Sequence, residues 1–352
     1  MSIYWSQTIR DLEPYVPGEQ PKDKRYVKLN TNENPYPPSP KALEAIRAAT
    51  NESLRLYPDP NCEDLKQAIA DHYGVTREKV FVGNGSDEVL ALSFITFFKQ
   101  NLPILFPDVT YSFYEVYCDL FGIASRRIPL AGDFSVHTGD YAQPNGGVLF
   151  ANANALTGHC VEPLHIRDLL VKNVDSVVAI DEAYIDFGGE TVIPLVEEFQ
   201  NLLVIQTFSK ARSLAGLRVG FAVGHEKLIE GLERAKNSFN SYPLGRLALA
   251  GAAASIQDDP YFQETRQKVM QTRERVVDQL NRMGFRVVPS QANFLLMEHP
   301  TVKGREIYDR LRDRGILVRY FNKPRVANHL RVTIGTEEEM DQFLRHLETI
   351  VS

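Results

Sequence analysis

Lys210 stands where a lysine could act as a nucleophile. It follows the apolar run Leu203 to Ile205, and the hydroxyls of Thr207 and Ser209 precede it. Burial and neighbouring cations lower the pKa of an amine, and the neutral amine attacks carbonyl groups. Arg218 follows one short loop later and could surround an anion together with the hydroxyls. Since most lysines are solvated surface groups, this interpretation depends on the residues around Lys210.

Two carboxylates and a phenol follow a second apolar run directly. Asp181, Glu182 and Tyr184 come after Val177 to Ile180. A carboxylate at the carboxyl end of a central strand is partly desolvated, so it needs a cation or several hydrogen-bond donors. A protonated pyridine nitrogen would be such a cation. Taken alone, the segment fits a helix cap or a surface acid equally well.

A third segment, GNGSDE over 83–88, lies between an apolar strand and an apolar helical run. A turn of small residues that feeds a helix N-terminus offers free N–H groups and the positive end of the helix dipole, which suits a phosphate. Glu88 occupies the position of the third glycine in a dinucleotide fingerprint, and no Walker-type Gly-Lys-Ser/Thr occurs. By itself, the segment also fits a helix that Ser86 or Asp87 caps.

These segments need a scaffold, and the apolar runs indicate one. Runs without polar alternation are typical of strands covered on both faces, so they predict a largely parallel sheet between helices. Ligands of such sheets bind at the carboxyl ends of the strands. The runs are Val80–Val82, Ile104–Phe106, Val148–Phe150, Val177–Ile180, Leu203–Ile205 and Val219–Val223.

The pattern divides the chain into an arm and two domains. Residues 1–40 are rich in Pro and Asn without a sustained period, which indicates an extended arm. Residues 41–250 hold the apolar runs and form the large domain. From Pro243 to about Met283 the pattern is helical, and short strands then alternate with helices. We therefore expect a smaller α+β domain over 251–352.

Composition excludes several classes of function. A net charge of −6 without a basic stripe argues against a nucleic-acid partner. The longest strongly apolar stretch, Val89 to Phe98, is far shorter than the roughly 20 residues that span a bilayer. Residues 1–6 lack the pattern of a signal peptide, so we expect a cytoplasmic protein without a membrane partner. The histidines and the cysteines lack ligand spacing, so we expect no metal.

Together the motifs resemble the fold-type I enzymes that depend on pyridoxal 5′-phosphate (PLP), and more narrowly the histidinol-phosphate aminotransferase group. The resemblance implies an α/β fold, with a mostly parallel seven-stranded sheet between helices in the large domain and a smaller α+β C-terminal domain. It covers nearly the whole chain: Leu29–Pro35, Tyr57-Pro58, Gly85–Glu88, Pro107–Tyr111, Asp181–Tyr184, Thr207–Lys210, Gly216–Arg218 and Leu330–Thr336.

The resemblance implies roles around the cofactor ring. Lys210 forms the Schiff base with PLP and, once the substrate amine displaces it, moves a proton between the substrate Cα and the cofactor C4′. Asp181 keeps the pyridine nitrogen protonated, so that the ring can accept electrons. Tyr184 donates to the ring O3′, and Tyr111 stacks on the ring face.

It also implies a phosphate site and a dimer. Main-chain N–H groups, hydroxyls and a guanidinium surround the cofactor phosphate. Tyr57 reaches that phosphate from the partner subunit, which makes a homodimer necessary for a complete site. The residues of the phosphate site within one chain are Ser86, Asp87, Thr207, Ser209 and Arg218.

For the substrates, the resemblance assigns Arg331 to the α-carboxylate of glutamate and Arg319 to the phosphate of histidinol phosphate. Tyr15 lies near the same phosphorylated substrate. The implied reaction is ping-pong transamination of histidinol phosphate with 2-oxoglutarate, a step of histidine biosynthesis. Relatives that act on aromatic amino acids, or that decarboxylate a phosphorylated amino acid, use the same Lys210 and Asp181. A non-catalytic protein with this fold is a further alternative, and Glu88 disfavours a nucleotide-dependent dehydrogenase.

One loop departs from the group. The usual Pro-Asn-Asn-Pro-Thr-Gly is here Ala-Asn-Ala-Leu-Thr-Gly over 153–158. Ala155 stands where an asparagine normally contacts O3′, so that contact is not transferred, and Asn154 could replace it only if the loop shifts. A cis bond costs ~2.5–4 kcal/mol before a residue other than proline, so we expect a trans Ala155–Leu156 bond.

Overall fold

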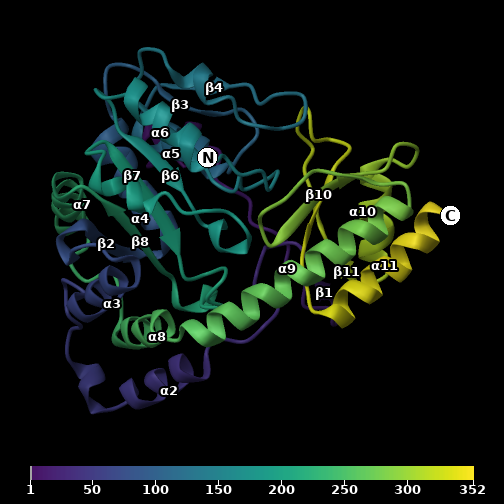
Figure 1. The fold of residues 1–352 in the computed structure, drawn as a ribbon, viewed down its shortest axis with the longest axis horizontal. Coiled ribbons are helices and arrows are strands. Elements are labelled where there is room, and N and C mark those ends of the chain that lie inside the picture. The colour runs from purple at the N-terminus through teal and green to yellow at the C-terminus, as the bar shows by residue number, and fades with distance from the viewer. Residues whose placement is uncertain (1) are drawn as a thin grey trace.

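The computed structural model describes residues 2–352, so Met1, the first residue of the segment examined for a signal peptide, lies outside it. A seven-stranded sheet has the order β2-β8-β7-β6-β5-β3-β4 (Figure 1). Strand β8 is antiparallel to β2 and β7, and the other pairs are parallel. The strands are β2 (Val80–Asn84), β3 (Ile104–Pro107), β4 (Ser125–Ile128), β5 (Gly147–Ala151), β6 (Val178–Asp181), β7 (Leu202–Thr207) and β8 (Val219–Gly224).

The mostly parallel seven-stranded sheet is confirmed, although the apolar runs located only six of its strands. Strand β4 gave no signal because three of its four residues, Ser125 to Arg127, are exposed at the edge of the sheet. An edge strand with polar residues on its surface has no continuous apolar run to find.

Helices cover both faces of this sheet, which explains the apolar runs. One core cluster joins the sheet to α3 (Glu63–Tyr73), α6 (Pro163–Lys172) and α8 (Arg246–Ile256). The other joins it to α4 (Gly85–Ser93), α5 (Phe113–Phe121) and α7 (Glu226–Phe239). Helix α2 (Pro40–Ala49) packs against α8. No helix within residues 2–352 is both long and apolar enough to cross a membrane.

The C-terminal unit has its own sheet and core, as the sequence predicted. Its antiparallel sheet has the order β12-β13-β10-β9. A separate hydrophobic cluster joins this sheet to three helices. The elements are α9 (Asp259–Arg282), β9 (Arg286–Val287), β10 (Phe294–Glu298), α10 (Gly304–Asp313), β12 (Arg319–Tyr320), β13 (Leu330–Thr333) and α11 (Glu337–Val351).

The long helical stretch after Pro243 is two helices, α8 and α9, with Gln257 and Asp258 between them. Ile256 belongs to the core of the large sheet, whereas Phe262 belongs to the core of the small one. We therefore propose that the two domains divide at Gln257–Asp258, a few residues after the boundary expected from the sequence.

The N-terminal arm is tied to the small domain. After the short helix α1 (Gln7–Asp11), strand β1 (Val27–Lys28) pairs in parallel with β11 (Ile316–Leu317). The chain then passes between the two domains to reach α2 (Figure 1). This path brings residues 30–34 of the arm to the carboxyl ends of β6 and β7, where Lys210 lies.

Candidate active site

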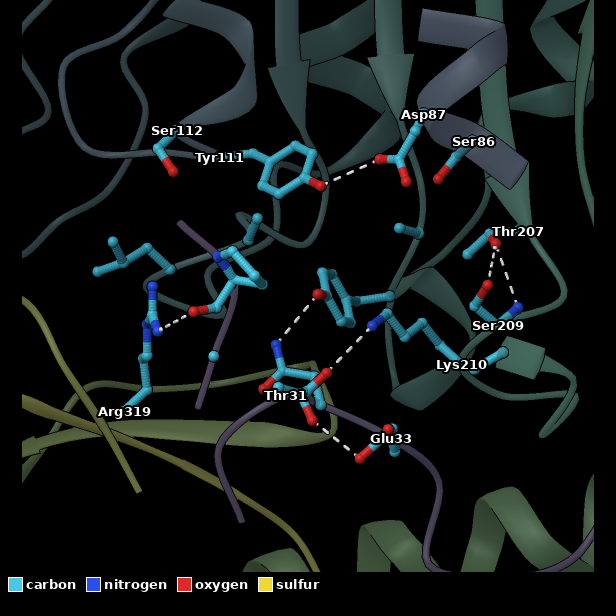
Figure 2. Close-up of a pocket in the computed structure, with 18 of the residues that line it drawn as sticks. Thr31, Glu33, Ser86, Asp87, Tyr111, Ser112, Thr207, Ser209, Lys210 and Arg319 are labelled. Carbon is cyan, nitrogen blue, oxygen red and sulfur yellow. Dashed lines mark hydrogen bonds between the residues drawn. The ribbon is translucent and has the colours of Figure 1, made fainter. Parts of the chain in front are cut away.

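A cavity of about 240 Å³ lies at the carboxyl ends of β6 and β7, between the large domain, the small domain and the arm. Every residue that the sequence placed in the site lines it, except Tyr57. Those residues are Tyr15, Ser86, Asp87, Tyr111, Asp181, Tyr184, Thr207, Ser209, Lys210, Arg218, Arg319 and Arg331. Figure 2 shows ten of the lining residues by name, with Arg319 across the cavity from Ser86 and Thr207.

Lys210 presents its amine to the cavity. Its Nζ donates to the carbonyl oxygen of Thr31 at 3.4 Å (Figure 2). The same atom lies 5.5 Å from the ring centroid of Tyr184. The side-chain amide Nδ2 of Asn34, in the arm, donates to the backbone carbonyl oxygen of Lys210 at 3.2 Å. Within residues 2–352, no carboxylate forms an ion pair with this amine. The amine is therefore available to a carbonyl group in the cavity.

Asp181 is a buried carboxylate without a cation. It is 4% exposed, Tyr114 donates to its Oδ2 at 2.8 Å, and the N–H of Ala183 donates to its Oδ1 at 3.2 Å. Burial raises the pKa of Asp181 to about 6, although the bond from Tyr114 lowers it. In the described part of the chain no arginine or lysine pairs with Asp181. A protonated ring nitrogen would supply the missing charge.

The residue Tyr114 was missed by the sequence analysis. It is fully buried on α5 among Phe94, Phe106 and Tyr111. An apolar helical face with aromatic residues ordinarily indicates core packing, and Tyr114 does pack there. Only the position of α5 beside β6 brings its hydroxyl to Asp181.

Tyr184 is held by a second residue that the sequence analysis did not single out, Asn32. The amide Nδ2 of Asn32 donates to the hydroxyl oxygen of Tyr184 at 3.0 Å. Asn32 is 1% exposed and has a positive φ of 56°, a conformation in which Asn is enriched. It lies within the matched segment Leu29–Pro35, but nothing local indicates its partner.

One end of the cavity is built for an anion. Helix α4 begins at Gly85 with a φ of +76°, and a Cβ there would lie 2.7 Å from Nη2 of Arg218. Arg218 donates to Asp87 at 2.8 Å and to Ser209 at 3.4 Å. The hydroxyl of Thr207 donates to that of Ser209 at 3.0 Å (Figure 2). A guanidinium, two hydroxyls and a helix N-terminus thus converge, as a phosphate requires.

Tyr111 forms a wall of the cavity. Its hydroxyl donates to Oδ1 of Asp87 at 3.0 Å (Figure 2). This bond holds the ring of Tyr111 in place along the cavity. Burial raises the pKa of Tyr111 well above its ordinary value, so the phenol stays neutral. A flat ligand ring can stack on such a fixed aromatic face.

Arg331 is a cation without an acidic partner. Its guanidinium donates to the carbonyl oxygens of Ala155 at 3.1 Å and Asn30 at 3.3 Å, and lies over the rings of Phe294 and Phe321. Burial lowers the pKa of Arg331, but an arginine remains charged. Among the described residues no carboxylate pairs with it. Arg331 therefore favours an anionic ligand.

Arg319 faces the cavity and also forms hydrogen bonds to the N-terminal arm. Its Nη2 donates to the carbonyl oxygen of Val16 at 3.0 Å, and its Nη1 donates to that of Pro17 at 3.2 Å. Tyr15, the residue before them, stacks on Phe113 with ring centroids 4.6 Å apart. Arg319 thus holds the arm at the mouth of the cavity while its charge stays unneutralised.

The divergent loop resolves the question of Asn154. Its Oδ1 accepts from the N–H groups of Leu156 at 3.0 Å and Thr157 at 3.1 Å, and its Nδ2 donates to Val109 at 3.0 Å. Asn154 is buried, is held by these bonds and does not line the cavity, so it does not replace the missing amide at Ala155. The Ala155–Leu156 bond is trans, as expected, whereas the bond between Asn152 and Ala153 is cis.

Tyr57 lies away from the cavity of its own chain. Tyr57 is 77% exposed, its ring stacks on Tyr242 with centroids 4.6 Å apart, and its carbonyl oxygen accepts from Arg246 at 2.8 Å. The expected contact of Tyr57 with a partner's phosphate site therefore stays a prediction.

Comparisons with known proteins agree with this geometry. The family model "Aminotransferase class I and II" matches residues 24–347. Histidinol-phosphate aminotransferase 1 of Hydrogenovibrio crunogenus is 56% identical over 351 residues, which span 100% of this chain and 99% of that protein. The histidinol-phosphate aminotransferase of Pseudomonas putida KT2440 is 59% identical over 345 residues, or 98% of this chain and 99% of that protein.

A solved structure shares the fold. The histidinol-phosphate aminotransferase of Sinorhizobium meliloti, in complex with pyridoxal-5′-phosphate, superposes with a TM-score of 0.91 at 24% identity and covers 100% of this chain and 98% of that chain. The fold, the full-length relatives and the family model lead to one assignment. The chain belongs to the class I and II aminotransferases and, within them, to the histidinol-phosphate aminotransferase family.

Proposed function

We propose that this enzyme transfers the amino group of histidinol phosphate to 2-oxoglutarate with PLP as its cofactor. The observation that carries the proposal is a pair of arginines, Arg331 and Arg319, that face one cavity without acidic partners among the described residues. Full-length relatives named histidinol-phosphate aminotransferase support it, and none of those reported above is named for aromatic substrates or for decarboxylation.

The residues of the cavity fit PLP. The hydroxyls and Arg218 at the start of α4 suit its phosphate, and the buried carboxylate of Asp181 lacks the cation that a protonated ring nitrogen supplies. Lys210 presents an amine with no ion-pair partner to the space between them. When bound, PLP supplies an electron sink that lets the substrate Cα lose a proton.

Each side chain of the cavity then has its own role in the proposed reaction. Asp181 holds a proton at the ring nitrogen, and Lys210 moves a proton from the substrate Cα. Tyr111 fixes the ring plane, and Tyr184 donates a hydrogen bond to the ring oxygen O3′. Tyr15 of the arm lines the cavity and stacks on Phe113, where it would limit the access of bulk water to the reacting atoms.

The two substrates need different anion sites, and the cavity offers both. Glutamate carries an α-carboxylate, which matches the planar guanidinium of Arg331. Histidinol phosphate has no α-carboxylate: a CH₂–O–phosphate group stands in its place, so its anionic charge lies farther from Cα. A second cavity of about 450 Å³ shares Tyr15, Arg319 and Phe321 with the first and gives room for this longer substrate.

We also propose a homodimer in which Tyr57 reaches the phosphate site of the partner subunit. Large apolar side chains next to Tyr57 in the chain, or at and next to the residue on which it stacks, are exposed, and exposed apolar surface marks interaction sites. They are Leu54, Leu56, Tyr242, which stacks on Tyr57, and Phe239 three residues before Tyr242. The expected cytoplasmic location also stays a prediction.

The proposed substrates are tested by two half-reactions in two variants. A charge-assisted hydrogen bond contributes roughly 1.5–3 kcal/mol, or about ten- to a hundredfold. Arg319→Ala should lower kcat/KM for histidinol phosphate by at least that factor, and it should lower kcat/KM for glutamate much less. Arg331→Ala should show the opposite bias.

The control is Arg286→Ala, which removes an arginine 73% exposed in its side chain, on strand β9 of the same domain and outside the cavity. It should change neither half-reaction. Equal losses for both substrates in Arg319→Ala would mean that this arginine acts only by holding the arm, and the assignment of histidinol phosphate would fail.

A further inference from the structure

A buried network connects the arm, the small domain and Tyr184. The backbone N–H of Asn32 donates to Oγ1 of Thr333 at 3.0 Å, and that hydroxyl donates to Oδ1 of Asn32 at 3.1 Å. The amide Nδ2 of Asn32 donates to the hydroxyl oxygen of Tyr184 at 3.0 Å. The side-chain amide Nδ2 of Asn293 donates to the backbone carbonyl oxygen of Asn32 at 3.0 Å. All these residues are less than 9% exposed.

The hydroxyl of Thr333 sets the orientation of the Asn32 amide, because the reverse orientation would leave this buried hydroxyl proton without an acceptor among the described residues. The hydroxyl of Thr333 accepts from a backbone N–H, so its proton is free for Oδ1 of Asn32. That contact leaves the NH₂ group of Asn32 facing Tyr184, where it can only donate. The oxygen of Tyr184 therefore accepts, and its single proton is left for another partner. Tyr184 lines the cavity, so that partner is the ligand.

The network ends beside the loop that lost its asparagine, since Ala155 and Tyr184 share one apolar cluster. Ala155 offers no side-chain amide to the cavity, and the amide of Asn154 is bonded to the loop and to Val109. Tyr184 thus has to supply the hydrogen bond to O3′ without the help that an asparagine at 155 would give. A hydroxyl whose proton is already aimed at the ligand loses less orientational freedom on binding than one that rotates freely.

We infer that Asn32, held by Thr333, is a positioning residue that aims the proton of Tyr184 at the ring oxygen of the cofactor. The inference rests on the proposed cofactor and on no particular substrate. Thr333 lies two residues after Arg331 on β13, so the strand that carries the carboxylate site also fixes this proton.

The test replaces the donor by an acceptor of the same shape. Asn32→Asp keeps the size of the side chain and its tolerance of positive φ, but offers oxygen where Nδ2 stood. The proton of Tyr184 should then turn to the new carboxylate and away from the cavity. A hydrogen bond to O3′ stabilises the deprotonated form of the bound chromophore, so its loss raises the pH midpoint of the absorbance titration.

We expect this midpoint to rise by about 0.5–1 pH unit, as for a lost hydrogen bond of ordinary strength. The affinity of the apoenzyme for PLP, measured by fluorescence quenching, should fall about three- to tenfold. Neither measurement uses an amino donor, so failure to turn over histidinol phosphate would refute the proposed substrate and leave this test intact.

A double-mutant cycle separates positioning from added charge. The charge of Asn32→Asp acts on the chromophore with or without a hydroxyl on residue 184, whereas the aimed proton exists only with the hydroxyl. In a Tyr184→Phe background, Asn32→Asp should therefore shift the midpoint less than in the wild type. Equal shifts in the two backgrounds, or no shift in either, would overturn the inference.

Two further variants keep the test decisive if Asn32→Asp folds poorly. Asn32→Gly tolerates the same φ without a charge and should raise the midpoint in the same direction. Adding Ala155→Asn to either variant returns an amide donor at residue 155 and should bring the midpoint back toward the wild-type value. A midpoint that stays at the wild-type value in Asn32→Gly would also overturn the inference.

Discussion

The exchange Asp181→Asn tests the electrostatic centre of the proposed site. Asp181 is 4% exposed, and burial raises its pKa from 3.8 to about 6. At about 1.4 kcal/mol per pKa unit, ionising this carboxylate in the free protein costs about 3 kcal/mol more than in water. A protonated ring nitrogen offsets that cost when PLP is bound. The substituted amide keeps the shape of the side chain and removes the charge.

The magnitude follows from the burial of the pair. Breaking a buried ion pair costs about 3–5 kcal/mol, because the partner charge is left without compensation. At about 1.36 kcal/mol per tenfold, kcat should fall by roughly two to four powers of ten. Since both half-reactions use the same ring, the loss should be equal for glutamate and for histidinol phosphate. Stopped-flow absorbance of each half-reaction measures it.

The pH dependence supplies a second readout. Protonated Asp181 cannot pair with a cation, so the affinity of the apoenzyme for PLP should fall as the pH drops below about 6. The bond from Tyr114 lowers the pKa of Asp181, so Tyr114→Phe should move this fall to higher pH while retaining more activity than Asp181→Asn. PLP itself also titrates in this pH range. Asp181→Asn is therefore the control, because in that variant only the titration of PLP can change the affinity. A loss of kcat below tenfold in Asp181→Asn would show that another group protonates the ring.

Two further exchanges test the covalent link and the assembly. Lys210→Ala should still bind PLP at the anion site but show no transamination and no adduct after borohydride reduction, as mass spectrometry would report; near wild-type turnover would refute the role of Lys210. Tyr57→Ala should weaken PLP binding, and mixed dimers with Lys210→Ala chains should regain activity at a low PLP concentration at which Tyr57→Ala alone is inactive; mixtures no more active than Tyr57→Ala alone would exclude a shared site.

Much of the scaffold could be predicted because its strands and helices produce local patterns in the sequence. Strands of a sheet covered on both faces need continuous apolar residues, and each such run was found. The motif residues stand directly after these runs, so Lys210 and Asp181 follow from the chain itself. Strand β4 escaped for the same physical reason, because its residues Ser125 to Arg127 face solvent.

The supporting residues of the site could not be predicted in this way. Asn32 and Thr333 are 301 residues apart, and Tyr114 and Asp181 are 67 apart. Their contacts arise from the packing of whole elements, for which no local period exists. Likewise, the sequence showed that Ala155 breaks a motif, but only the hydrogen bonds of Asn154 show that no neighbour fills the gap.

The arm therefore has a larger part in the site than its composition suggested. It pairs with the small domain through β1 and β11, and Arg319 holds it at Val16 and Pro17. Its Asn32 reaches Tyr184 of the large domain. Arg331 binds both the arm, at Asn30, and the loop of the large domain, at Ala155. A guanidinium has five N–H donors and these two contacts use one on each terminal nitrogen, so the remaining donors can bind a ligand carboxylate while Arg331 keeps the arm and the loop together. Binding of the substrate and the fit of the arm against the two domains are therefore coupled through this one guanidinium.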